Sequence, residues 1–394
     1  MTGNAETMKT AELNCPSCGV VVFPGEGFCE ACGHRLSDDA EAAEDTAPAP
    51  AAAAVSAAAG GCVGCGGSAI DADGYCERCG LRQPAERDHV EVELPGRAAA
   101  GVSDRGKRYA RNEDAMALAG HAGGVAAVVS DGVGSSPNPD DASRTAADTA
   151  LAELVARLAD GSAPDAAMRA AIARASDAVA ALAASPAEAP SCTFVSAVTA
   201  PGSVTVGWIG DSRAYWLPSA APAAPNGSAP RRAPGRDAGS PLDTLDPAEA
   251  DRPELRASRA LTTDDSWAAY MIAEGTLTEA EAEVHPNAHV ITGWLGADND
   301  DLRPHVATFV PDPDVPGTLL VCSDGLWNYL PGAEDLAAVL AEAAADPAAD
   351  PLGAARALVR RALDAGGRDN ITVAVIPLPA RTTTSPSSPL EHAR

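Results

Sequence analysis

Apolar residues between positions 99 and 379 form short runs, and several runs stop at an acidic turn. GVAAVVSDG (124–132) and GTLLVCSDG (317–325) are of this kind and are typical of buried strands. CTFVSAVT (192–199) and SVTVGWI (203–209) are predicted to pair as antiparallel strands through Pro201-Gly202. In the second run Val204, Val206 and Trp208 alternate, which predicts one buried face. SRAYWL (212–217) and ITVAVIPL (371–378) are further predicted strands.

Other stretches have helical spacing. The helix predicted after the first strand has apolar residues at Leu151, Leu154, Val155 and Leu158. Further helices are expected at about 164–183, 332–345 and 352–365. Thr263 or Asp264 is expected to cap a helix that begins near Ser266, and Thr278 to cap another. Hairpin strands mixed with paired helices predict an α+β sandwich, with the sheets in the middle and the helix pairs outside.

The composition narrows the class of protein. Of the 394 residues 46% are hydrophobic but only 4% are aromatic, so Ala and Val are expected to fill much of the core. No apolar stretch approaches the roughly 20 residues of a membrane helix, and the N-terminus lacks the layout of a signal peptide. We therefore expect a soluble, cytoplasmic protein with no membrane partner. The net charge of −27 argues against nucleic acid as a partner, but bound cations can reverse the local field.

Eight of the ten cysteines form two copies of the pattern C-x2-C-x10-C-x2-C. The copies contain Cys15, Cys18, Cys29 and Cys32, and then Cys62, Cys65, Cys76 and Cys79. Paired Cys-x-x-Cys knuckles suit a structural zinc ion, so two zinc ions per chain are expected; disulfide and redox interpretations are weaker. Neither copy is basic, so both are expected to bind protein or to act within the molecule rather than to bind nucleic acid. The other two, Cys192 and Cys322, are interpreted as small buried hydrophobic residues.

These patterns divide the chain. The expected parts are zinc ribbon 1 (1–36), an acidic Ala/Pro-rich linker (37–61), zinc ribbon 2 (62–83), a second linker (84–98), a large folded domain (99–379) and a disordered tail (380–394). Inside the large domain, residues 218–255 are rich in Ala, Pro, Gly and Asp and are interpreted as a disordered insertion.

Five acidic signatures adjoin the predicted strands. They are Asn112-Glu113-Asp114, Ser130-Asp131-Gly132, Gly210-Asp211-Ser212-Arg213, Ser323-Asp324-Gly325 and Asp369-Asn370. A single Asp-Gly turn does not by itself indicate a functional site, because both residues favour turns for local backbone reasons. Buried acidic residues are costly unless they are paired or bind a metal, so several at strand ends suggest one site for hard cations.

The ordered set RNEDA, VVSDGVG, GWIGDSRAY, LTTDDSW, LVCSDGLW and RDNITV resembles the PP2C (PPM) family of metal-dependent serine/threonine protein phosphatases. The resemblance covers about residues 100–378 and implies an α-β-β-α sandwich, in which two antiparallel sheets are flanked by helix pairs. It implies one-step hydrolysis of phosphoserine and phosphothreonine by water activated between two Mn²⁺ or Mg²⁺ ions. A phosphorylated protein substrate, a bacterial Ser/Thr kinase that the enzyme opposes, and a flap at about 262–300 are expected with it.

The resemblance also assigns roles to residues. Asp131 would bridge two metal ions, Gly132 would lend its carbonyl, and Asp324 and Asp369 would hold the first ion. Glu113, with Asp114 nearby, would hold waters of the second ion. Asp211 would support, with Asp324, a third and weaker ion; the alternative is a simple turn residue.

The phosphate-binding residue is less defined. Tyr109 occupies the position at which many family members have an arginine, and Arg108 and Arg111 flank it. Arg111 is the preferred candidate for a bidentate phosphate contact, and a plain surface arginine is the alternative. His285 and His289 are expected on the surface or in packing. A second hypothesis for the whole chain is a non-catalytic sensor with the same fold, against which the intact Asp131, Asp324 and Asp369 argue.

Overall fold

The structure is a computed structural model of the whole chain. It describes residues 13–14, 21–22, 61–71, 74–185, 188–219, 257–299, 302–343 and 345–380. The chain forms two compact units: Met1–Ala85 with Arg108–Ala110, and Glu86–Lys107 with Arg111–Arg394. Four expected features lie largely or wholly outside the described residues: zinc ribbon 1 with its four cysteines, the first linker, the insertion at 218–255 and the tail at 380–394.

In the first unit, β1 (Leu13–Asn14) and β2 (Val21–Val22) pair as antiparallel strands. Residues 61–85 contain two tight turns, each built around a Cys-x-x-Cys pair. The N–H of Gly66 donates to the carbonyl of Cys62, and the N–H of Gly80 donates to that of Cys76, both at 2.8 Å. Both glycines have φ near +70°, a left-handed conformation that glycine adopts without strain.

The second unit contains two larger antiparallel sheets. The six-stranded sheet has the order β11 (Arg259–Ala260), β10 (Arg213–Pro218), β14 (Gly317–Cys322), β15 (Ile371–Leu378), β4 (Ala100–Asp104) and β3 (His89–Glu93). The five-stranded sheet has the order β13 (His305–Phe309), β9 (Ser203–Ile209), β8 (Phe194–Ala200), β6 (Gly124–Ser130) and β5 (Ala115–His121). A short pair is formed by β7 (Ser191–Cys192) and β12 (Leu295–Gly296).

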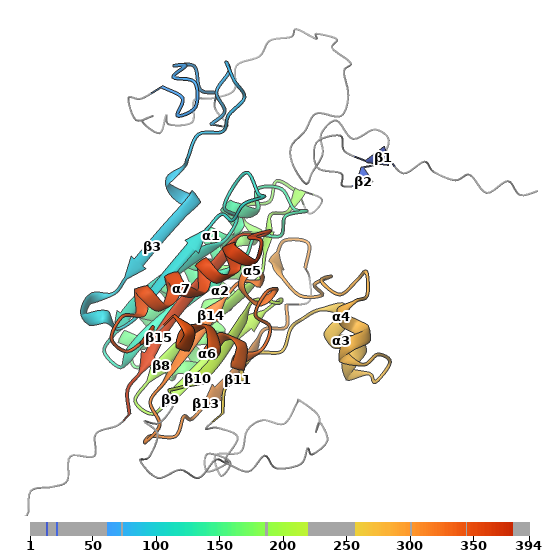
Figure 1. The fold of residues 1–394 in the computed structure, drawn as a ribbon. Helices are drawn as coiled ribbons and strands as arrows, with labels where there is room; N and C mark the ends of the chain where they lie inside the picture. Colours follow the sequence, from blue (N-terminus) through green and yellow to red (C-terminus); the bar gives the residue numbers. More distant parts are fainter. Residues whose placement is uncertain are drawn as a thin grey trace, which may run out of the picture. The chain divides into compact units, whose positions relative to one another are not determined.

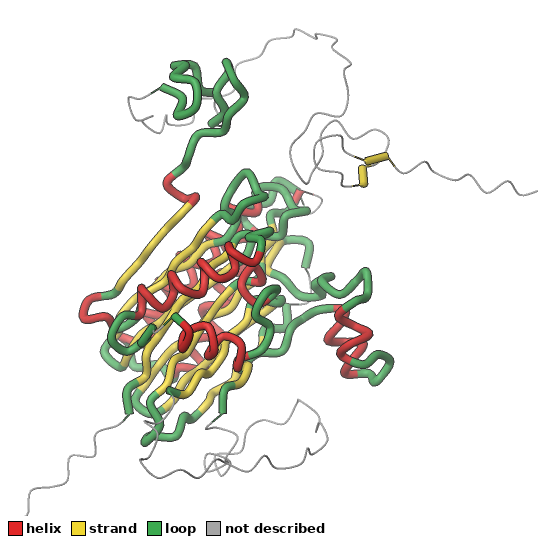
Figure 2. The backbone as a smooth tube through the Cα atoms, in the orientation of Figure 1, coloured by secondary structure: helices red, strands yellow, loops and turns green. Residues whose placement is uncertain are grey.

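Helices cover the outer face of each sheet (Figures 1 and 2). α1 (Pro139–Ala159) and α2 (Pro164–Ala180) pack on the five-stranded sheet. α6 (Ala333–Glu342), α7 (Pro351–Ala365) and the single turn α5 (Asp324–Trp327) pack on the six-stranded sheet. The remaining helices are α3 (Trp267–Ala273), α4 (Glu279–Glu283), η1 (Glu86–Asp88) and η2 (Pro95–Arg97). The predicted α-β-β-α sandwich is confirmed.

Small residues form much of the core, as the composition predicts. The face of α1 that packs on the sheet is mostly alanine, with Leu154 as its one large buried side chain. Val125, Val195 and Leu319 belong to the separate core layer between the two sheets. Cys192 and Cys322 are fully buried among apolar residues, which confirms their interpretation. Alanine lets a helix approach a sheet closely, so few aromatic residues are needed.

The expectation of one buried face on β9 is wrong, because the strand is buried on both faces. Val206 belongs to the layer between the sheets, whereas Ile209 packs with α1 and α2. A Cβ on Gly207 would lie 2.5 Å from Cγ of Met168, so the absence of a side chain at Gly207 lets α2 pack closely on β9. Alternating apolar and polar residues indicate a strand with one solvated face. In this sandwich the helices cover the outer face of the sheet, so neither face of β9 is solvated.

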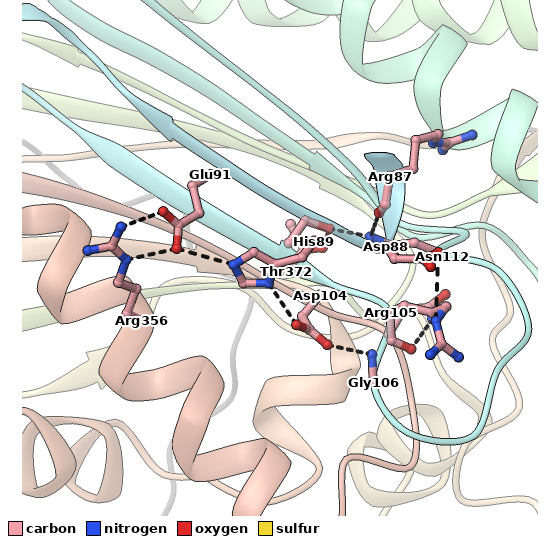
Figure 3. A network of polar contacts seen from close by, with 12 residues as sticks. Arg87, Asp88, His89, Glu91, Asp104, Arg105, Gly106, Asn112, Arg356 and Thr372 are labelled. Atoms are coloured by element: carbon pink, nitrogen blue, oxygen red, sulfur yellow. Dashed lines mark hydrogen bonds and ion pairs between the residues drawn. The ribbon is translucent and has the colours of Figure 1, made fainter. Parts of the chain in front are cut away.

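The predicted linker at 84–98 is also corrected, since it contains β3, an edge strand paired along its length with β4. Figure 3 shows its polar contacts. His89 bonds through Nδ1 to Asp104 at 2.7 Å and through Nε2 to Glu91 at 3.2 Å. Arg356 of α7 donates from Nε to Glu91 at 2.8 Å. The sequence HVEVE is as polar as a solvated linker, because β3 lies at an exposed edge of the sheet and every second residue is charged or polar.

Two helix caps were predicted in the 262–300 region. Thr278 caps α4 with a complete capping box, as expected. The cap of α3 is Ser266, which accepts a bond from the N–H of Ala269 at 3.1 Å, and not Thr263 or Asp264. Those two residues are engaged elsewhere, with Trp208 and Arg213 respectively. Among all helices in the described ranges, none is long and apolar enough to cross a bilayer.

Candidate metal centre

Five aspartates lie where strands meet at one end of the sandwich. Asp114 precedes β5, Asp131 follows β6, Asp211 lies beyond β9, Asp324 lies beyond β14, and Asp369 lies shortly before β15. Because paired strands are antiparallel, the start of one strand lies beside the end of its neighbour: Ala115 pairs with Ser130, and Val373 with Cys322. Tertiary structure therefore gathers the predicted acidic residues.

The negative charges of these aspartates act on one another. Burial and then the charges of the other four carboxylates raise the pKa of Asp131 well above its usual value. Burial and then the charge of Asp324 raise the pKa of Asp369 to about 8. Burial raises the pKa of Asp114 to about 6. Like charges this close are unfavourable unless protons or cations compensate them.

Two carboxylate oxygens in this cluster lack a hydrogen-bond donor within the described part of the chain. They are Oδ1 of Asp114 and Oδ1 of Asp324, both buried. The second oxygen of each is bonded: Ser323 Oγ donates to Asp114 at 2.7 Å, and Asn328 Nδ2 donates to Asp324 at 3.1 Å. A buried unsatisfied polar group costs about 1–3 kcal/mol. A hard divalent cation would satisfy such oxygens, so the residues present fit the expected metal.

The glycines of the two Ser-Asp-Gly signatures have a steric role. A Cβ on Gly132 would lie 2.5 Å from the carbonyl oxygen of Pro139, the first residue of α1. A Cβ on Gly325 would lie 1.8 Å from the carbonyl oxygen of Asn370. Both positions therefore require glycine, because backbone from another element approaches closely beside the aspartate.

Glu113 lies at the rim of the cluster and is half-buried. Burial and then the charges of Asp140 and Asp114 raise its pKa to about 7, while the positive charge of Arg111 lowers it. Its backbone N–H donates to Asn370 Oδ1 at 2.7 Å. The expected phosphate ligand Arg111 is thus close enough to Glu113 to influence it electrostatically, and it is exposed.

Two asparagines organise the chain around Glu113. Asn370 donates from Nδ2 to the carbonyl oxygens of Arg105 at 2.8 Å and Arg111 at 3.1 Å. Asn112 donates from Nδ2 to the carbonyl oxygen of Arg87 at 2.9 Å and to Ser103 Oγ at 2.9 Å. Sequence reasoning quoted both asparagines within motifs but gave them no role. The only signal was that each directly adjoins a predicted metal residue.

Asp211 lies in a turn fixed by surrounding groups. It is 7% exposed, and burial, followed by the charges of Asp324 and Asp264, raises its pKa well above the usual value. Trp327 Nε1 donates to its backbone carbonyl at 2.9 Å. Asp211 is therefore an acidic member of the cluster as well as a turn residue.

The pKa shifts predict how the domain responds to pH without metal. Asp369 and Glu113 hold protons in the folded state up to about pH 8 and 7, whereas the unfolded chain loses them near pH 4. Stability of the metal-free domain should therefore fall as pH rises from about 4 through 8. Mn²⁺ should cancel the trend, because it binds deprotonated carboxylates. All five tryptophans lie beyond residue 200, so tryptophan fluorescence during heating monitors this domain. A flat profile in EDTA would contradict the expectation.

The second cysteine repeat forms a compact group. Ligand atoms of Cys62, Cys65, Cys76 and Cys79 all lie within 4.8 Å of one another, and no other such group occurs among the described residues. The Sγ–Sγ distances Cys62–Cys79 and Cys65–Cys76 are both 3.6 Å, far longer than a disulfide bond. Sulfurs bound tetrahedrally to zinc at about 2.3 Å lie about 3.8 Å apart, so the group fits zinc.

Part of the larger unit is similar to a known protein family. The family model for protein phosphatase 2C matches residues 103–224. Residues 103–224 are therefore similar to protein phosphatase 2C (PP2C) domains. Of the signatures described above, those at Asn112, Ser130 and Gly210 lie inside the match, and those at Ser323 and Asp369 lie beyond it.

Relatives extend the comparison. "Protein phosphatase PhpP" of Streptococcus pneumoniae is 38% identical over 116 residues, which are 29% of this chain and 44% of PhpP. The match to this curated relative thus spans less than half of its length. Mycobacterium tuberculosis serine/threonine phosphatase PstP/Ppp is 26% identical, with a TM-score of 0.50 over 71% of this chain and 97% of that structure. Stp1 of Staphylococcus aureus, at 22% identity, a TM-score of 0.53, and coverage of 73% and 98%, supports the PP2C fold alone.

Proposed function

We propose that this chain is a metal-dependent phosphatase that hydrolyses phosphoserine and phosphothreonine in proteins. The observation that carries the proposal is the cluster of mutually repelling carboxylates in a PP2C fold, with two buried oxygens that lack donors among the described residues. The names of the matched relatives, protein phosphatase and serine/threonine phosphatase, support the same reaction class.

The proposed ligands are Asp131, Gly132, Asp324 and Asp369, with Glu113 and Asp114 at the second ion and Asp211 at a third. When bound, two Mn²⁺ or Mg²⁺ ions lower the pKa of a water and offset charge on the phosphoryl oxygens.

The protein's own groups would orient the substrate. Arg111 is exposed beside Glu113, and its carbonyl is held by Asn370, which fixes the backbone from which the guanidinium extends. We propose that it binds the substrate phosphate in a bidentate manner. Burial holds Asp114 in place, and partial exposure of Asp131, Asp324 and Asp369 leaves the cluster open to a phosphate ester.

The N-terminal part is proposed to carry two zinc ribbons that bind protein. For the second ribbon the support is the spacing of its sulfurs. The first rests on the repeated cysteine pattern. Free thiols in such number suit a reducing compartment, in line with the expected cytoplasmic location. We also propose that the enzyme removes phosphate groups that a Ser/Thr kinase adds to proteins.

Hydrolysis of p-nitrophenyl phosphate and of a phosphothreonine peptide tests the function. We expect turnover of both with Mn²⁺ and none with EDTA, because the carboxylate cluster alone repels a phosphate anion. A phosphotyrosine peptide serves as the comparison substrate and should react more slowly. Absence of turnover with Mn²⁺ in a folded preparation would exclude the enzyme and favour the alternative, a non-catalytic binding protein with this fold.

A further inference from the structure

The segment between Asp265 and Thr292 leaves the sandwich and returns to the place from which it started. It carries α3 and α4, which extend away from the sheets in Figure 1. The N–H of Thr292 donates to the carbonyl of Asp265 at 2.7 Å, and the N–H of Trp267 donates to that of Val290 at 2.8 Å. Both ends of the segment therefore meet at Asp265.

Asp265 in turn holds the Gly210–Asp211 turn from two sides. Its backbone N–H donates to the carbonyl of Gly210 at 2.8 Å, and its Oδ2 accepts from the N–H of Gly210 at 3.0 Å. Its Oδ1 pairs with His305 Nε2 at 2.8 Å. The His305 ring stacks on Trp208 of β9, with 4.8 Å between ring centroids. The carboxylate thus joins the base of the segment to the five-stranded sheet and to the peptide before Asp211.

Asp264 holds the other side of the same turn. It accepts from Arg213 at 2.8 Å from Nε and at 2.6 Å from Nη2, a bidentate pair that is largely shielded from solvent. The guanidinium of Arg213 lies 3.6 Å from the centroid of the Trp327 ring. Trp327 belongs to α5, which begins at Asp324, and donates to the Asp211 carbonyl. Two adjacent carboxylates thereby connect the segment to both Asp211 and Asp324.

We infer that Asp264 and Asp265 are positioning residues that set the place of the Asp211 carboxylate relative to Asp324, and that link it to the segment 266–292. The inference rests on the proposed function. The physical reason is that Gly210, with φ of +96°, has no side chain to fix its conformation, so its two bonds with Asp265 help to hold the turn. A substrate or partner that contacts the segment would then change the position of the Asp211 carboxylate.

A double-mutant cycle between Asp265→Ala and Asp211→Asn tests this inference. We expect each single variant to lower kcat for the phosphothreonine peptide by about 10- to 100-fold, as for outer residues that orient metal ligands. KM should change much less than kcat. In the double variant Asp265→Ala should add little, because Asp211 is already lost. Asp265→Asn, which still accepts a bond from Gly210, should recover most of the activity.

A second readout is independent of activity. Mn²⁺ titration followed by electron paramagnetic resonance should lose its weakest class of sites in both single variants and keep the tight ones. The matched control is Asp350→Ala, which removes another carboxylate that accepts a backbone N–H, here at the start of α7, and should leave Mn²⁺ binding unchanged. If Asp265→Ala does not fold, His305→Leu, which removes the partner of Oδ1 together with the ring that stacks on Trp208, takes its place in the cycle.

Additive losses in the double variant would overturn the inference, as would a Mn²⁺ titration that Asp265→Ala leaves unaltered. If Asp211→Asn changes neither kcat nor Mn²⁺ binding, Asp265 has no ligand to position and the inference fails, while the phosphatase proposal, which rests on Asp131, stands. If the unaltered protein has no activity, the proposed function fails and the Mn²⁺ titration alone decides the inference.

Discussion

Asp131→Asn should abolish Mn²⁺-dependent hydrolysis of p-nitrophenyl phosphate and leave the fold intact. Burial and the charges of four other aspartates raise the pKa of Asp131, so its carboxylate lies near theirs. Asparagine keeps the size of the side chain and removes one negative charge from the proposed ligand set. Metal ions contribute several kcal/mol to such reactions, so we expect a loss of about a thousandfold in kcat/KM.

The same substitution should stabilise the metal-free protein. This gain in stability distinguishes loss of a metal ligand from damage to the fold. Removing one charge relieves repulsion on Asp114, Asp324 and Asp369, so in EDTA at pH 8 the variant should melt at a higher temperature than the unaltered protein. With Mn²⁺ the order should reverse. The matched control, Asp148→Asn, changes an exposed aspartate on α1 and should alter neither property. Retained activity, or a lower melting temperature in EDTA, would contradict the role of Asp131.

Cys76→Ser should remove one of two zinc ions per chain and unfold residues 62–83. Cys76 is 1% exposed, and its sulfur lies 3.6 Å from that of Cys65. Apart from Cys62 and Cys76, no described apolar side chain of this module is buried, so it has little core of its own. Zinc contributes about 10–16 kcal/mol to the folding of comparable modules at neutral pH, so loss of one thiolate should be decisive.

Zinc content by mass spectrometry and limited proteolysis check this second prediction. Cys29→Ser in the first repeat is the matched variant and should also leave one zinc ion per chain. Cys322→Ser, in the core of the larger unit, should leave both ions bound. Hydrolysis of p-nitrophenyl phosphate should persist in Cys76→Ser, because the larger unit has its own apolar layers. Two zinc ions retained in Cys76→Ser would reject the ribbon assignment.

Strands and helices with a strong local pattern were predictable. β9 and β15 have the predicted bounds, and α1, α2, α6 and α7 each lie at a predicted place. β3, β5 and β13 were missed for physical reasons. β3 alternates charged residues along an exposed edge, β5 (AMALAGH) is rich in residues that also favour helices, and β13 is short and begins with a histidine. Their pairing partners, not their own residues, make them strands.

The sequence by itself determined the architecture, the acidic signatures and the cysteine repeats, because strand ends, turns and Cys-x-x-Cys spacings are local. Only the tertiary structure decided how the acidic residues are held. Asp114 is bonded to Ser323, 209 residues away, and Glu113 to Asn370, 257 residues away. It also decided which oxygens lack donors within the described ranges and how Asp265 holds the Asp211 turn. Such contacts arise when distant strands pack into one sandwich, so no local pattern encodes them.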